Sequence, residues 1–435
     1  MTPFTIGCIG MAALVIAIFL RVPIGMGMIG IGALGFAAIS GIDPALSLLR
    51  SVPYETYVNY NYCVVPLFLI MGNFAFKSGI SNDLYYAVHR LMGRIKGGLA
   101  MATVAACGGF AAICGSSVAC AVTMGVVALP EMKRYRYDSG LATGVLAAGG
   151  TLGILIPPST IMILYGIIAE QSIGELFMAG FLPGIIQAGM YMAMVMFLVK
   201  RRPELGPAGE ACPVREKLKA ISRVWSIIAL FVLVIGGIYS GLFTPNEAAG
   251  IGAFGAFLLG VSRCRGKGNF RSFLKDSMVE SISTTGMSYV IMVGAMVFGY
   301  FLAVSRVPFE LAELIGSTGA SPTIVLIAIL AILLLLGCFM DSMAIVLLTV
   351  PIFMPLIQKF GIDPIWFGIL VVRVTEMGLI TPPVGLNLFV IQGVANVPMT
   401  KVFSGVLPFI CMDFLHLFLL LAFPKITLLL PQILM

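Results

Sequence analysis

The stretch EMGLITPPVG at residues 376–385 places two consecutive prolines inside a long apolar segment. A second stretch, TLGILIPPS at residues 151–159, shows the same pattern 225 residues earlier (382 − 157). Because proline lacks a backbone N–H and its ring clashes with the preceding helical turn, each pair is expected to break a helix. The same interruption occurring twice predicts a chain of two halves built on one plan.

Apolar residues dominate the composition. The chain has 435 residues, of which 60% are hydrophobic and 10% charged, whereas soluble domains have about 25% charged residues. Many segments approach or exceed the roughly 20 apolar residues that span a bilayer. Their apolar runs are continuous and do not alternate as barrel strands do, so we predict an all-α polytopic membrane protein. The ten predicted spans lie near residues 4–20, 24–41, 63–76, 139–169, 176–200, 224–240, 248–262, 278–304, 364–396 and 404–424.

Basic residues gather on one side of the predicted spans. With the N-terminus outside, most of the 26 Lys and Arg residues fall on inner segments, as the positive-inside rule requires. This bias accounts for the net charge of +7 without a nucleic-acid partner. It holds only if 98–130 and 321–358 each enter and leave on one side. We therefore predict two re-entrant helical hairpins, the first opening inward and the second outward; two ordinary spans joined by a turn are the alternative.

The two halves align as an internal repeat when shifted by 225 residues. Residues 114–186 then match 339–411 without gaps. The first broken span is predicted to run outward and the second inward, so the copies are expected to be inverted. Inverted repeats with interrupted helices are typical of secondary transporters. The matched pairs include Ser117 with Ser342, Pro130 with Pro355, Asp138 with Asp363, Gly153 with Gly378, and Pro157-Pro158 with Pro382-Pro383.

Each break should free backbone carbonyls that only a cavity or a ligand can satisfy in lipid. Each hairpin also has a polar tip, CGSS at 114–117 and MDS at 340–342. Joining each tip to the break of its own half predicts two Na⁺ sites, whereas kinks that only shape packing are the alternative. Asp341 is the one carboxylate at these tips, and charge at membrane depth is usually functional. The predicted Na⁺ residues are Gly115, Ser116, Ser117, Gly153, Pro157, Ser159, Asp341, Ser342, Gly378, Thr381 and Pro382.

An anionic substrate could lie beside the cation, because helix N-termini at the tips attract negative charge. Arg373 and Glu376 are spaced i, i+3, so they either pair with each other or leave Arg373 to receive a substrate carboxylate. Both interpretations stay open. The residues predicted to border the substrate are Pro158, Arg373, Glu376, Pro383 and Asn387.

Other chemistries find little support in the sequence. The nine cysteines are scattered and there are only two histidines, His89 and His416, so we predict no metal other than Na⁺ and no organic cofactor. No phosphate-binding loop is present. A membrane enzyme is disfavoured because no catalytic constellation is seen, and a channel is disfavoured by the repeat with broken helices.

Four motifs, CGSSVA, LGILIPPS, GLFTPNEAAG and GLITPPVGLNLFV, carry a family resemblance. Together they resemble the large membrane subunit (DctM-like) of tripartite ATP-independent periplasmic (TRAP) transporters, over essentially the whole chain. The resemblance implies Na⁺-coupled import of an organic anion, such as sialic acid or a C4-dicarboxylate, across a bacterial inner membrane. It also implies a small four-helix membrane subunit and a periplasmic substrate-binding protein as partners. A stand-alone Na⁺/carboxylate symporter of the wider ion-transporter group is the alternative.

The resemblance further implies an elevator mechanism, in which the hairpins and broken helices move as a transport domain against a scaffold. We expect a polar inter-repeat linker at 201–223 within the scaffold, and an amphipathic interfacial helix at 79–96. The predicted parts are 1–97 (scaffold helices and interfacial helix), 98–170 (first hairpin and broken helix), 171–320 (scaffold), 321–397 (second hairpin and broken helix) and 398–435 (C-terminal helix).

Overall fold

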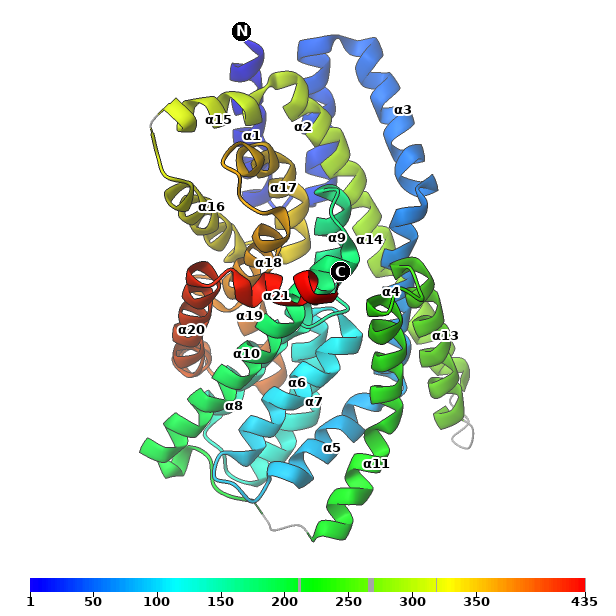
Figure 1. Ribbon diagram of the computed structural model, residues 1–435, viewed down its shortest axis with the longest axis vertical. Coiled ribbons are helices and arrows are strands. Elements are labelled where there is room, and N and C mark those ends of the chain that lie inside the picture. The colour runs from blue at the N-terminus through cyan, green and yellow to red at the C-terminus, as the bar shows by residue number, and fades with distance from the viewer. Residues whose placement is uncertain (210–212, 265–269, 318, 435) are drawn as a thin grey trace.

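The computed structural model describes residues 1–209, 213–264, 270–317 and 319–434. Within these ranges the regular structure is helical and contains no strand, which confirms the predicted all-α class. Figure 1 shows an elongated bundle in which most helices run close to the long axis.

The N-terminal third begins with helices at three of the predicted positions, but it also contains a helix that was not predicted. The additional helix is α3, which carries Asp43, Arg50 and Glu55 and is therefore too polar to stand out as a span. It lies along α2 and α14. The predicted amphipathic helix is present as α5, which buries Leu84 and Tyr85. The elements are α1 (Pro3–Phe19), α2 (Ile24–Ser40), α3 (Ile42–Val58), the short helix η1 (Tyr60–Cys63), α4 (Val64–Lys77) and α5 (Ile80–Met92).

Both predicted hairpins form as pairs of helices with polar turns between them. The first consists of α6 (Gly98–Cys114) and α7 (Ser117–Arg134), and the second of α16 (Pro322–Gly337) and α17 (Ser342–Lys359). In Figure 1 the first pair lies in the lower half of the molecule and the second in the upper half. The two hairpins therefore approach the middle of the bundle from opposite ends.

Both proline pairs interrupt helices, as the sequence predicts. The first break separates α8 (Ser139–Leu155) from α9 (Thr160–Ile168), and these two helices are bent by 42° relative to each other. The second separates α18 (Pro364–Ile380) from α19 (Leu386–Ala395). The peptide bond between the two prolines is cis in both breaks.

The repeat is also visible in the way its helices begin. Asp138 caps α8 by accepting the Leu141 N–H at 3.0 Å, and its counterpart Asp363 caps α18 by accepting the Trp366 N–H at 2.8 Å. An N-cap side chain satisfies an amide that has no partner inside its own helix. Matched positions in the two halves thus perform the same local task.

The remaining helices pack around the two hairpins and the two broken helices. Two of them, α10 and α20, pack against α8 and against each other. The second part of the polar stretch 201–223 is helical, because α11 already begins at Val214. The elements are α10 (Ile173–Arg201), η2 (Pro203–Leu205), α11 (Val214–Phe231), the π-helical turn η3 (Val232–Gly236), α12 (Gly237–Tyr239), α13 (Pro245–Cys264), α14 (Phe270–Ser305), α15 (Val307–Ser317), α20 (Met399–Ala422) and α21 (Lys425–Leu434).

Helix length and composition support fewer spans than the ten predicted. Five helices in the described ranges are long and apolar enough to cross a membrane, and up to seven if each bent pair counts as one span. Several predicted spans, including α1 and α2, have only 17 residues. The ten-span count therefore stays a prediction, while the hairpins and the breaks are features of the fold.

Candidate ion and substrate site

The first hairpin tip lies directly against the first break. The Thr160 hydroxyl at the start of α9 donates to the Gly115 carbonyl oxygen at 2.8 Å. A Cβ built on Gly153 would lie 3.2 Å from the Ser116 carbonyl oxygen, so a larger residue there would have to push the two backbones slightly apart. The predicted association of this tip with this break is therefore present in the structure.

The second tip meets the second break in a corresponding way. The Gly385 N–H donates to the Cys338 carbonyl oxygen at 3.2 Å. Upstream of the break, Gly378 faces Gly337 so closely that a Cβ on Gly378 would lie 2.4 Å from the Gly337 Cα. Helices α16 and α18 thus touch through their backbones just before the tip and the break.

Glu376 links the two hairpins. The Ser342 hydroxyl at the second tip donates to Glu376 Oε1 at 2.8 Å, and the hydroxyl of Ser117 at the first tip lies close enough to interact with the same carboxylate. All three side chains are at most 2% exposed. Glu376 Oε2 has no hydrogen-bond partner among the described residues. One buried carboxylate therefore stands between tips that are far apart in the sequence.

Three predicted site residues serve as helix N-caps. Ser116 accepts the Ala119 N–H at 3.4 Å, and its counterpart Asp341 accepts the N–H groups of Met343 and Ala344 at 3.2 and 3.4 Å. Ser159 caps α9 by accepting the Met162 N–H at 3.3 Å. These oxygens consequently lie at the N-terminal ends of α7, α17 and α9, where helix dipoles favour negative charge.

The two breaks differ in their exposure. Gly153, Pro157 and Pro158 are buried with the rest of the first break, whereas Pro382 and Pro383 are exposed. The Thr381 hydroxyl donates to the Met377 carbonyl oxygen at 2.6 Å and so satisfies a group of its own helix. Asn387, at the start of α19, is buried, and neither polar atom of its side chain has a partner in the described structure.

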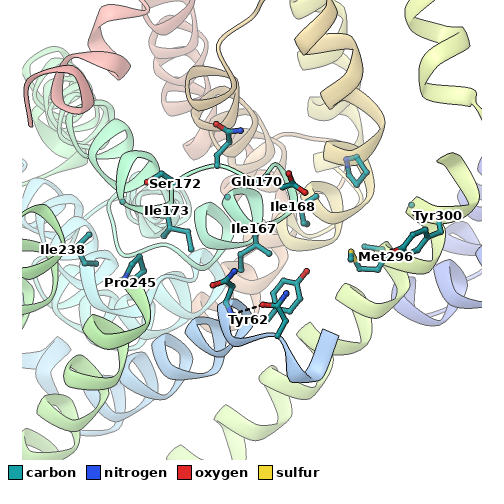
Figure 2. Close-up of a pocket in the computed structure, with 18 of the residues that line it drawn as sticks. Tyr62, Ile167, Ile168, Glu170, Ser172, Ile173, Ile238, Pro245, Met296 and Tyr300 are labelled. Atoms are coloured by element: carbon teal, nitrogen blue, oxygen red, sulfur yellow. Dashed lines mark hydrogen bonds between the residues drawn. The ribbon is translucent and has the colours of Figure 1, made fainter. Parts of the chain in front are cut away.

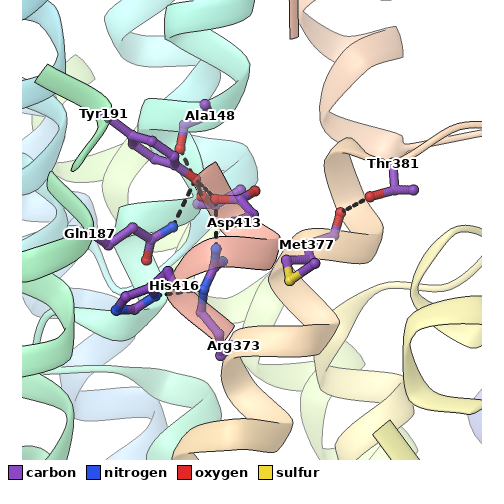
Figure 3. Close-up of polar contacts among 9 residues, drawn as sticks. Ala148, Gln187, Tyr191, Arg373, Met377, Thr381, Asp413 and His416 are labelled. Atoms are coloured by element: carbon purple, nitrogen blue, oxygen red, sulfur yellow. Dashed lines mark hydrogen bonds and ion pairs between the residues drawn. The ribbon is translucent and has the colours of Figure 1, made fainter. Parts of the chain in front are cut away.

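Arg373 does not form an ion pair with Glu376, which was one of the two interpretations that their spacing left open. Arg373 Nη2 instead lies 2.6 Å from Asp413 Oδ1, and Arg373 Nε donates to His416 Nδ1 at 3.0 Å (Figure 3). Asp413 and His416 both belong to α20. The long side chain of Arg373 reaches them across the interface between α18 and α20. Arg373 is only 1% exposed, and its Nη1 has no hydrogen-bond partner in the described structure.

Sequence reasoning missed the partners of Arg373. Asp413 and His416 lie on one face of α20, and Tyr191 of α10 donates to Asp413 Oδ1. Gln187 in turn donates to the Tyr191 hydroxyl at 2.7 Å. The available signal was Asp413 itself, a carboxylate within an apolar predicted span and spaced i, i+3 from a histidine.

A separate cavity of about 990 Å³ opens between α9 and α14 (Figure 2). Its lining includes Asn59, Tyr62, Ile168, Glu170, Met296 and Tyr300. None of the predicted ion or substrate residues, all of which the structure describes, lines it. The hairpin tips therefore do not border this cavity.

Two helical hairpins packed against two broken helices around a buried carboxylate define the protein as a multi-pass membrane transporter. The family model described as "Tripartite ATP-independent periplasmic transporter, DctM component" matches residues 11–426. The chain belongs to this family, as the sequence resemblance predicts.

Relatives of known name agree with this assignment. The chain is 36% identical to the C4-dicarboxylate TRAP transporter large permease protein DctM of Pseudomonas aeruginosa, over 90% of this chain and 93% of that protein. It is 32% identical to the sialic acid TRAP transporter large permease protein SiaM of Vibrio cholerae, over 96% of each. Its fold is similar to the crystal structure of the Alcanivorax borkumensis YdaH transporter, with a TM-score of 0.65, 16% identity, and coverage of 87% of this chain and 88% of that one.

Proposed function

We propose that the protein is the large membrane subunit of a Na⁺-coupled importer in the bacterial inner membrane. Its substrate would be an organic anion delivered by a periplasmic binding protein, and a small four-helix membrane subunit would complete the assembly. The relatives named for C4-dicarboxylates and sialic acid act on molecules that carry carboxylates. A carboxylate is therefore the proposed substrate class.

The observation that carries this proposal is the position of Glu376 between both hairpin tips. An ionised carboxylate buried without a counter-charge is strongly unfavourable, and Glu376 Oε2 has no partner in the described residues. A monovalent cation would supply the missing charge. Hydroxyl and carbonyl oxygens of Ser117, Ser342 and the two breaks would complete its coordination.

The inverted arrangement of the repeats is part of the proposal. Hairpins that enter from opposite ends of the bundle (Figure 1) support it, as does the run of positive charge along the predicted inner segments. In the proposed elevator mechanism, the hairpins and broken helices carry the bound ion and anion across the bilayer past the scaffold.

We propose a position for the substrate anion from the exposure and charge of the two tips. Ser116 and Asp341 are partly exposed at the two tips, and Pro383 is exposed at the second break. The N-terminus of α17 is already occupied by the charge of Asp341, which would repel a second anion. The N-terminus of α7 is capped by the neutral Ser116 and remains attractive to negative charge. We therefore place the substrate carboxylate closest to α7.

Reconstitution tests this function. The large subunit should be incorporated into liposomes with and without its small membrane subunit, and radiolabelled succinate or N-acetylneuraminate added with and without the binding protein. Uptake that requires an inward Na⁺ gradient and both partners is expected. Na⁺-driven uptake by the large subunit alone would instead favour a stand-alone symporter, and uptake indifferent to Na⁺ would contradict the proposal.

Replacing Asp341 with Asn separates its charge from its capping role. Asn is about as good an N-cap as Asp, so the Asp341→Asn protein should keep its thermal stability. Loss of the negative charge should raise the Na⁺ concentration for half-maximal uptake about tenfold, since about 1.4 kcal/mol corresponds to a factor of ten. Asp363→Asn is the matched control, because Asp363 caps α18 in the same way away from the tips. An unchanged Na⁺ dependence would remove Asp341 from the ion site.

A further inference from the structure

We propose that Arg373 is a positioning residue, whose buried ion pair with Asp413 fixes α18 so that Glu376 lies between the two hairpin tips. This inference rests on the proposed function, because it concerns how the ion site is held. It assigns to the Arg373–Asp413 pair, with His416 and Tyr191, a role in Na⁺ binding without contact to the ion or the substrate.

Arg373 lies in a buried cluster of polar side chains. Asp413 Oδ1 lies 2.6 Å from Arg373 Nη2 and also accepts the Tyr191 hydroxyl, while His416 Nδ1 accepts the Arg373 Nε–H (Figure 3). Asp413, His416 and Tyr191 are each 0% exposed. Arg373 Nη1 has no hydrogen-bond partner in the described structure, but it is buried with the rest of the side chain. The ion pair with Asp413 and the hydrogen bond to His416 are therefore the contacts that hold the guanidinium against α20.

Arg373 and Glu376 sit one helical turn apart on α18 but extend to different neighbours. The arginine reaches α20, and the glutamate reaches Ser342 at the second tip. Rotating or sliding α18 to move one of these side chains would move the other. Because a buried charge separated from its partner is strongly unfavourable, the ion pair holds the position of the helix that carries Glu376.

Residues of both halves meet in this cluster. With the same offset of 225 residues, Glu376 corresponds to Thr151 (376 − 151) and His416 corresponds to Tyr191 (416 − 191). The Thr151 and Tyr191 hydroxyls lie 3.3 Å apart, and Tyr191 donates to Asp413. The cluster therefore ties α8 and α10 of the first half to α18 and α20 of the second. Both broken helices are anchored at one buried point.

The test uses the full-length protein and Na⁺ itself as the probe. The variants are Arg373→Met, Asp413→Leu and the double variant, which removes both charges at similar volume. Half-saturating Na⁺ is measured from the Na⁺-dependent rise in the melting temperature of the purified protein, with K⁺ as the comparison ion. Each single variant should need roughly tenfold more Na⁺, and the double variant should return to within about threefold of the wild type, because only an unpaired charge displaces the helix.

The Arg263–Asp83 ion pair is the matched control. Its atoms are also 2.6 Å apart, but the side chains are 27% and 26% exposed and lie away from the tips. Arg263→Met and Asp83→Leu should each leave half-saturating Na⁺ within about twofold, as expected for a partly solvated pair. A similar loss in this control would show that any broken ion pair has the effect and would overturn the assignment.

Further results would contradict either this inference or the proposed function. A folded double variant that binds Na⁺ as poorly as Arg373→Met would overturn the inference, as would single variants with unchanged Na⁺ binding. If the Arg373 variants do not fold, Tyr191→Phe decides. It removes the hydroxyl that donates to Asp413, and with it the contacts to Gln187 and Thr151, while leaving both charges of the ion pair in place. It should raise half-saturating Na⁺ about threefold; an unchanged value would overturn the proposal. A wild-type protein that Na⁺ does not stabilise would contradict the proposed function instead.

Discussion

Replacing Glu376 with Gln should nearly abolish Na⁺-dependent uptake while leaving the protein folded. The amide oxygen can still accept the Ser342 hydroxyl, which bonds Glu376 Oε1 at 2.8 Å, so the second tip keeps its contact. The negative charge that balances the cation is lost. A loss of about 2–3 kcal/mol of interaction with a charged group corresponds to roughly 30- to 150-fold more Na⁺ for half-maximal uptake. Uptake into liposomes at a series of Na⁺ concentrations measures this shift.

A glutamate in an exposed ion pair provides the control. Glu280 lies 2.9 Å from Lys77 and is 45% exposed, and pairs of this kind contribute about 0–1 kcal/mol. Glu280→Gln should therefore transport with nearly the wild-type Na⁺ dependence. If Glu376→Gln folded and behaved in the same way, the carboxylate between the tips would have no part in ion binding.

Replacing Gly378 with Ala should destabilise the contact between α16 and α18. The new methyl group would lie 2.4 Å from the Gly337 Cα, and a backbone atom cannot turn away as a flexible side chain can. Helices α16 and α18 would have to separate next to the second tip and break. Forcing extra volume into a packed interface costs about 1–3 kcal/mol, so the melting temperature in detergent should fall. The rise in melting temperature that Na⁺ produces should also be smaller than in the wild type.

Gly393→Ala is the comparison variant, because Gly393 lies in α19 and a Cβ there would meet no atom within 4 Å. Alanine is favoured over glycine in helices by up to about 1 kcal/mol. This variant should melt at or slightly above the wild-type temperature. Equal melting temperatures for Gly378→Ala and wild type would show that α16 and α18 can move apart at little cost in stability.

The features predicted well from sequence are those with a local cause. Two consecutive prolines interrupt each broken helix, whereas single prolines such as Pro130 and Pro183 stay inside continuous helices. Short polar turns at 114–117 and 340–342 allow each hairpin to fold back. The capping aspartates Asp138 and Asp363 also act within one turn. Helix α3 escaped prediction because its charges mask it in a search for apolar spans.

The sequence by itself determined the helical class, the two hairpins, the two breaks and their repetition, since hydrophobicity, proline and glycine act on neighbouring residues. Only the tertiary structure decided which side chains meet. The spacing of Arg373 and Glu376 suggested a local pair, yet Arg373 turned to Asp413, 40 residues away (413 − 373), and Glu376 to the hairpin tips. A long charged side chain can reach several partners, and the packing of α18 against α20 decides which of them it meets.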